Sequence, residues 1–163
     1  MKPQTQKYQF GEGFGDCHRT CIAMILNMDR DSVPHFMIDL PPGTPADDLR
    51  SKDCTAAEIA WLAQFNLSLV SIPIIGSALL DDVIWQLQMT SHAPVILGCG
   101  TIAGNHSVVI HEGIVYNPHP ALQITGPMAD GFWWITIYSP NDNWGYAPLQ
   151  AVPTFASVVK QED

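Results

Sequence analysis

The stretch Phe14-Gly-Asp-Cys-His-Arg-Thr-Cys-Ile-Ala-Met-Ile-Leu-Asn-Met28 places a thiol at the start of an apolar helical pattern. The apolar side chains recur at helical spacing, which predicts a helix that begins at or just before Cys17 and ends near Asn27 or Met28. Asp16 is a residue type that caps helix N-termini. The free N–H groups and the dipole at such an end favour a thiolate, the nucleophilic form of cysteine. We therefore expect Cys17 to be a nucleophile; the alternative is a cysteine packed as a small hydrophobe.

A second informative stretch, residues 104–120, predicts a β-hairpin. His106 opens a β-branched strand, Ser107 to Ile110; a Glu-Gly turn follows, and then a second strand, Ile114 to Tyr116. A hairpin returns the end of its second strand to the start of its first. Asn117 is therefore expected to hydrogen-bond His106 and to fix its ring. The chain then supplies a thiol, an imidazole and an orienting amide, in that order.

These two stretches resemble the C39-like peptidases of the papain-like superfamily. Residues 15–26 resemble the family's Asp-Cys-Gly-x-x-Cys-Leu-Ala-Met-Ile segment, and residues 106–110 and 116–118 resemble its His-Phe-Val-Val and Asp-Pro segments. The likeness is closer still to small uncharacterised phage and prophage proteins of this superfamily. Those carry a Cys-x-x-x-Cys helix, a Val-Pro-x-Phe segment and a His-x-Val-Val…Asp-Pro-His-Pro hairpin. The matching segments here are Cys17 to Cys21, Val33 to Phe36 and His106 to Pro120, and the resemblance covers residues 14–36 and 92–121.

The resemblance implies an α+β papain-like fold in which an N-terminal helix carrying the nucleophile packs on an antiparallel sheet. It implies a cysteine hydrolase that cleaves a peptide or related amide (isopeptide) bond, in a polypeptide of host or phage, through a Cys17 thioester. His106 would be the base, Asn117 would orient it, and the backbone N–H of Cys17 would stabilise the oxyanion. Asn117 stands where the family usually has Asp. The oxyanion glutamine of papain-like enzymes is also displaced, because Gly11 lies six residues before Cys17 and the nearest glutamine is Gln9.

Three other functions stay open. The chain could be a catalytically inactive papain-fold binding protein of phage origin that engages a host protein. It could also be a deamidase or acyltransferase that uses the same dyad. A zinc site could use Cys17, His18 and Cys21 with Cys54 or His106, but no second close-spaced cysteine pair is present. We therefore expect no metal and no organic cofactor.

The composition narrows the partners and the compartment. The 163 residues predict a single domain, 1–163, with a loose or strand-like lead-in at 1–13 and a loose tail at 154–163. The net charge of −9, with only 7 Lys and Arg, disfavours nucleic acid and anionic membranes as partners. No apolar run is long enough to span a membrane. Four cysteines without a signal segment indicate reduced thiols in a cytoplasm, that of the host cell for a phage protein.

The remaining pattern predicts further helices and strands. A capping box, Thr55 to Glu58, starts a helix that ends near Phe65. Cys21 is expected to pack in the core, His18 to be exposed or to line the cleft, and His119 to rim the site. Trp133, Trp134, Trp144 and Tyr146 are core residues or line a substrate groove. The other expected elements are a short turn at Val33 to Met37, a strand at Leu67 to Ile72, a Ser77-capped helix at Ala78 to Met89, a central strand at Pro94 to Cys99, a turn at Gly100 to Asn105 and a strand at Phe132 to Tyr138.

Overall fold

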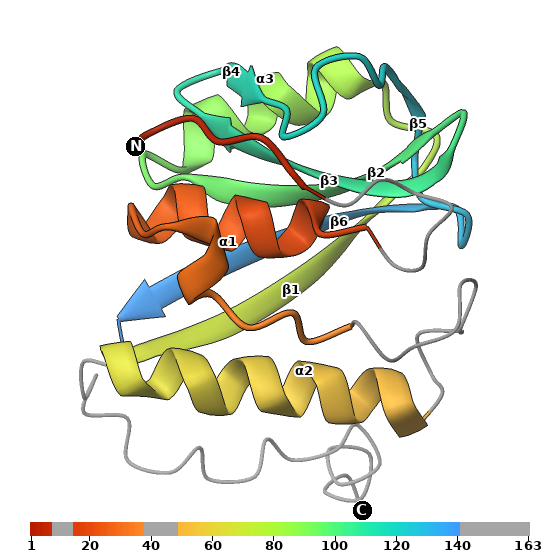
Figure 1. Cartoon of the computed structure of the whole chain (residues 1–163). Coiled ribbons are helices and arrows are strands. Elements are labelled where there is room, and N and C mark those ends of the chain that lie inside the picture. Colours follow the sequence, from red (N-terminus) through yellow and green to blue (C-terminus); the bar gives the residue numbers. More distant parts are fainter. Residues whose placement is uncertain (8–14, 38–48, 141–163) are drawn as a thin grey trace, which may run out of the picture.

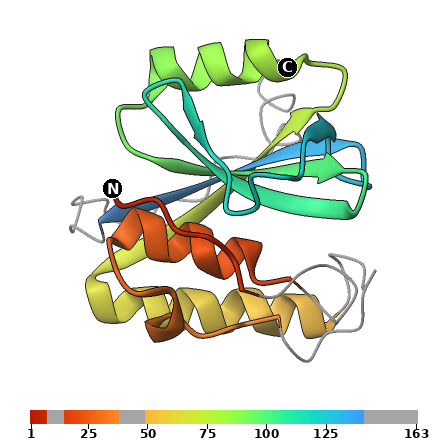
Figure 2. The same ribbon diagram turned by 45° about the horizontal axis from the view of Figure 1, so that its top comes forward.

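The computed structural model describes residues 1–7, 15–37 and 49–140. In these segments the protein is an α+β structure built on one antiparallel sheet, as the sequence predicts (Figure 1). Two helices cover one face of the sheet and a third covers the other (Figure 2). The helices are α1 (Cys17–Leu26), α2 (Leu49–Leu62) and α3 (Leu80–Thr90), with short 3₁₀ turns at Arg30–Ser32 and Ala63–Phe65.

The strands follow the order β1-β6-β2-β3-β4, and β5 pairs with β2. Strand β2 is central and its first five residues are buried, which confirms the prediction from its apolar run. Strand β5 escaped prediction because three residues ending in glycine show no clear alternation. The bounds are β1 (Leu67–Ile75), β2 (Val95–Thr101), β3 (Gly104–His111), β4 (Ile114–Tyr116), β5 (Ile124–Gly126) and β6 (Phe132–Pro140).

The β3–β4 hairpin forms as predicted. Its Glu112-Gly113 turn has positive φ at both residues, +52° and +76°, which is the conformation that a tight two-residue hairpin turn requires. The register pairs Val109 with Tyr116 and His111 with Ile114. At the other end of β3 the predicted turn is shorter than expected, because Thr101 still pairs with Gly104.

The sheet separates two hydrophobic cores. Residues of α1 and α2 pack on one face with Ile96, Val109 and Tyr138. Residues of α3 pack on the other face with Leu97, Val108 and Ile135. Neighbouring residues of β3 thus serve opposite cores, as strand alternation requires. Cys21 lies on α1, and its side chain is fully buried in the core on that face of the sheet, which confirms its packing role.

Two helix starts differ from the sequence prediction. Helix α2 begins at Leu49, so the expected capping box lies in the middle of the helix, and Glu58 is buried there. The residues ahead of Thr55 include good helix formers, which extend the helix upstream. Helix α3 begins after Leu79 and has no side-chain cap, so Ser77 does not cap it. No helix in the described ranges has the length and apolarity of a membrane span.

Candidate active site

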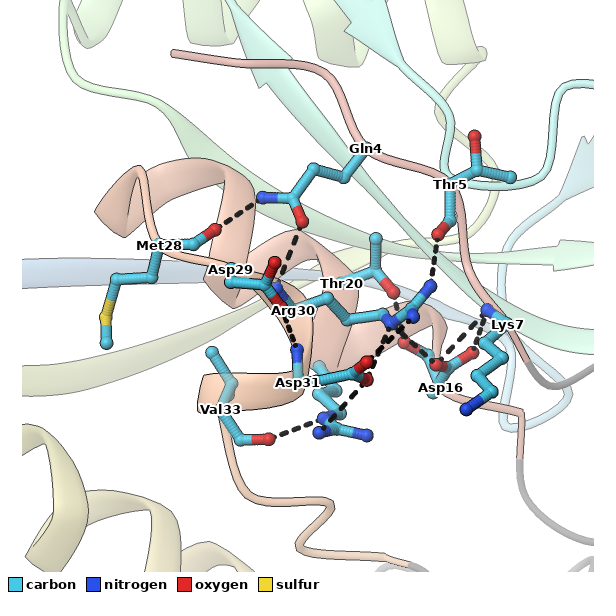
Figure 3. Close-up of polar contacts among 11 residues, drawn as sticks. Gln4, Thr5, Lys7, Asp16, Thr20, Met28, Asp29, Arg30, Asp31 and Val33 are labelled. Carbon is cyan, nitrogen blue, oxygen red and sulfur yellow. Dashed lines mark hydrogen bonds and ion pairs between the residues drawn. The ribbon is translucent and has the colours of Figure 1, made fainter.

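The nucleophile candidate sits at the first residue of α1, as predicted. Asp16 occupies the N-cap position, but its side chain does not cap the helix. Its carboxylate is completely buried and accepts hydrogen bonds from the Lys7 backbone N–H, at 3.0 and 3.2 Å. The Arg30 guanidinium lies 3.6 Å away (Figure 3). The backbone carbonyl of Asp16 accepts from the Thr20 hydroxyl at 2.8 Å, inside the first turn.

The N-terminal segment ties this helix start to the hairpin. Gln4 bonds Met28 O and the Arg30 N–H, and Arg30 donates to the Thr5 carbonyl (Figure 3). The Gln6 N–H donates to the Pro118 carbonyl at 3.0 Å, one residue past Asn117. Residues 4–7 of the expected lead-in are therefore tied to the segment around α1 and to the hairpin. The rest of that lead-in with Gln9, and the tail at 154–163, lie outside the described residues.

His106 and Asn117 meet as the hairpin predicts. The His106 Nε2 and the Asn117 Oδ1 are 2.9 Å apart. Asn117 Nδ2 donates to the Leu122 carbonyl at 2.7 Å, and Asn117 Oδ1 also accepts from the His119 N–H at 2.8 Å. These contacts orient the amide with its oxygen toward His106, so Nε2 carries the proton and donates it. The other ring nitrogen, Nδ1, is then the basic one.

This arrangement explains an asparagine where the resembling family usually has aspartate. The Asn117 NH₂ group donates to a carbonyl oxygen, and an aspartate would place a second acceptor there. Two acceptors at 2.7 Å repel unless one is protonated. The Leu122 carbonyl therefore selects the amide at this position.

The Cys17 sulfur rests one strand position away from His106. It is contacted by the backbone and hydroxyl of Ser107, the next residue along β3, and by the His18 backbone N–H. Among the described residues no hydrogen bond joins the Cys17 sulfur to His106. The structure therefore assembles His106 with Asn117 and brings the Cys17 sulfur to Ser107, but it does not join Cys17 to His106. Side chains alternate along a strand, so Ser107 shares the α1 face of β3 with Val109, whereas His106 shares the other face with Val108.

The electrostatics of this resting state are those of a neutral pair. Burial raises the pKa of the Cys17 thiol, and the Asp16 carboxylate adds to this, while the contacts with Ser107 and His18 act to lower it without prevailing. Burial lowers the pKa of His106; the bond to Asn117 opposes this and the charge on His119 reinforces it. The expected thiolate is thus wrong for this state, because desolvation outweighs the helix N-terminus.

His119 rims the site, as expected, and couples to it. Its backbone N–H shares the Asn117 oxygen with His106, and its ring Nδ1 is buried with no partner among the residues described. We predict that His119→Ala raises the pKa of His106, because it removes a positive charge that opposes protonation there. The measurement is the His106 Hε1 titration by NMR. The matched control is His92→Ala, an exposed histidine; a His106 midpoint equal in both variants would refute the coupling.

The aromatic candidates that the structure describes, Trp133 and Trp134, bind partners other than Cys17, His106 and Asn117. Trp133 is 2% exposed and donates to the Ala78 carbonyl in the α3-side core. It also borders a cavity of about 270 Å³ that is lined by residues 76–80 and 124–127. Trp134 is half-buried and donates to Asp130. Trp144 and Tyr146 lie outside the described residues. His18 is bound to Glu58, and its side chain is 25% exposed.

Neither a metal-binding group of side chains nor a similar known protein identifies the function of this site. Within residues 1–7, 15–37 and 49–140, no three His, Cys, Asp or Glu side chains are grouped so that they could hold a metal ion. The zinc alternative therefore has no assembled site in this part of the chain. Comparison of the chain with models of protein families, with curated proteins and with solved structures gave no match.

Proposed function

We propose that this protein is a papain-like cysteine hydrolase that cleaves a peptide or related amide bond through a Cys17 thioester. The observation that supports the proposal is the oriented His106–Asn117 pair, together with a thiol at the start of α1 whose sulfur contacts Ser107, the next residue of the same strand. The proposal requires the His106 ring to turn toward Cys17 when substrate binds. A base held by a third group, next to a thiol at a helix N-terminus, is the arrangement of nucleophilic catalysis. Such hydrogen bonds are often incomplete without substrate and tighten in the complex.

The first half of the reaction forms the thioester. The Cys17 sulfur leaves Ser107 and attacks the substrate carbonyl, while His106 Nδ1 takes the thiol proton. The backbone N–H groups at the start of α1 stabilise the oxyanion. The tetrahedral intermediate then collapses, the C–N bond breaks, and the leaving amine takes the proton from His106.

The second half regenerates the enzyme. His106 removes a proton from water, whose oxygen attacks the thioester carbonyl. The C–S bond breaks and the carboxylic acid is released, and Cys17 recovers its proton from His106. An amine in place of water gives acyl transfer, and a glutamine side chain as substrate gives deamidation. These alternatives share every residue of the proposed site.

The test is the thioester itself. We predict that p-nitrophenyl acetate gives a burst of one p-nitrophenolate per chain and an acetyl group on Cys17, located by intact mass and peptide mapping. Cys17→Ser is the control for the nucleophile and should retain the fold without the burst. A folded parent with no burst would support the non-catalytic binding alternative, and acetylation spread over several cysteines would contradict an activated Cys17.

A further inference from the structure

A largely buried row of polar contacts joins His18, the residue after the nucleophile candidate, to Glu58 and Tyr138; the His18 side chain is 25% exposed. The His18 Nε2 contacts both Glu58 carboxylate oxygens, at 3.0 and 3.2 Å, and the Tyr138 hydroxyl donates to Glu58 Oε1 at 2.6 Å. The three residues come from α1, α2 and β6. Glu58 is only 6% exposed and Tyr138 9%. These polar contacts therefore link α1, which carries Cys17, to α2 and to the sheet.

Burial and the contacts among the three side chains shift the pKa of each group. Burial acts to lower the pKa of His18, but the Glu58 carboxylate outweighs it and the pKa is raised. Burial acts to raise the pKa of Glu58, but His18 and then Tyr138 outweigh it and the pKa is lowered. Burial and the Glu58 charge raise the pKa of Tyr138, as does the nearby Cys21 thiol. These directions favour an imidazolium–carboxylate pair between His18 and Glu58 and a neutral phenol at Tyr138.

A contribution to folding stability does not by itself explain the His18–Glu58–Tyr138 contacts. Desolvation of a buried ion pair offsets much of its attraction, and apolar side chains of similar size often stabilise as well or better. The surroundings are apolar, since Tyr138 belongs to the core cluster that includes Cys21, Ile22 and Met24. What these polar contacts add is a directional link that fixes the rotation and the depth of α1.

That constraint falls on the residue next to the nucleophile. His18 follows Cys17 directly, and its backbone N–H contacts the Cys17 sulfur. A rotation of α1 that broke the Glu58 contact would also move Cys17 relative to Ser107 and His106. Given the proposed function, the consequence is catalytic, because a displacement of about 1 Å at a reacting atom costs about 10²-fold in rate.

We propose that His18, Glu58 and Tyr138 form a positioning latch that holds the start of α1, and with it the Cys17 sulfur, in a fixed place against β3. The proposal rests on the proposed function, since it assigns a purpose to the placement of that sulfur. The latch residues touch no substrate and act through Cys17. Their effect should therefore depend on the presence of His106.

The experiment is a double-mutant cycle read by alkylation. Iodoacetamide rates at Cys17 are measured by peptide mass in the parent, Glu58→Gln, His106→Ala and the double variant. We expect Glu58→Gln to lower the alkylation rate of Cys17 by about tenfold in the parent background. In the His106→Ala background the same substitution should lower that rate by less than about twofold. Asp53→Asn, an exposed carboxylate on the same helix, is the matched control. The alkylation rate of Cys54 on α2 is measured in the same samples, and an increase in it indicates partial unfolding.

The same cycle separates a latch from a structural role. An equal slowing of Cys17 in both backgrounds would show that Glu58 acts without His106 and would overturn the latch. A faster reaction at Cys54 together with Cys17 would show partial unfolding; Tyr138→Phe, which removes only a hydroxyl, then replaces Glu58→Gln in the cycle. Rescue by the His18→Gln/Glu58→Gln pair, which restores a hydrogen bond without charge, is expected to return the Cys17 rate to within about twofold of the parent.

Failure of the proposed function would look different. If His106→Ala alone leaves the Cys17 rate unchanged, the base assignment fails, and no cycle involving Glu58 is needed to see it. If His106→Ala slows Cys17 but Glu58→Gln does not, the dyad stands and the latch alone is refuted.

Discussion

Replacement of His106 by alanine is expected to lower the rate of Cys17 acetylation by about 10²- to 10⁴-fold at pH 7, with the fold retained. The physical reason is the neutral resting state. Because burial raises the pKa of the Cys17 thiol, little thiolate is present near neutral pH, and attack needs a base to take the proton. The Asn117 contact leaves Nδ1 of His106 as that base. The measurement is the single-turnover rate with p-nitrophenyl acetate.

The matched control is His111→Ala, at the far end of the same strand. It makes the same exchange of residue type and should leave the acetylation rate within about twofold of the parent, because a site distant from the reacting atoms is not coupled to them. The pH profile adds a second check. Since the pKa of His106 is lowered, the parent's acid limb should lie below the ordinary histidine value of 6.5. Equal rates in His106→Ala and the parent would remove His106 from the mechanism.

The part of the site that follows from local sequence was predictable. The Glu112-Gly113 turn and the strands beside it specify a hairpin, and a hairpin of that register brings Asn117 to His106. The start of α1 at Cys17 was equally clear from the onset of helical apolar spacing. In both places the partners lie close together in sequence, so local rules are enough.

The part that failed depends on contacts between distant segments. Thr55 to Glu58 reads as a capping box, yet Glu58 finds its partners 40 and 80 positions away, at His18 and Tyr138. The helix N-terminus predicts a lowered pKa for Cys17, but burial raises it, and burial is decided by how α1 packs on β3. Sequence spacing carries no direct record of either contact.

Asp16 shows the same limit, because its residue type predicts a helix cap and its side chain does something else. The carboxylate does not cap the helix; it accepts from the Lys7 N–H and lies beside Arg30 (Figure 3). It thereby joins the N-terminal segment, the start of α1 and the 3₁₀ turn at Arg30–Ser32, next to Cys17. The Asp16 carboxylate itself is fully buried, although Arg30 is 20% exposed, so its removal leaves the Lys7 N–H without this acceptor.

We therefore predict that Asp16→Ala lowers the free energy of unfolding by about 2 kcal/mol, because it removes the buried carboxylate that accepts from the Lys7 N–H. Arg30 loses one carboxylate neighbour but keeps Asp31 and the Thr5 carbonyl. Asp31→Ala is the matched control. It removes another carboxylate partner of Arg30, but that side chain is 57% exposed, so the expected loss is much smaller than that of Asp16→Ala. Urea unfolding of both variants, followed by circular dichroism, gives the comparison. Losses of equal size would mean that the Asp16 contact does not hold the N-terminal segment against α1, and the start of the nucleophile helix would then owe its position to the apolar core alone.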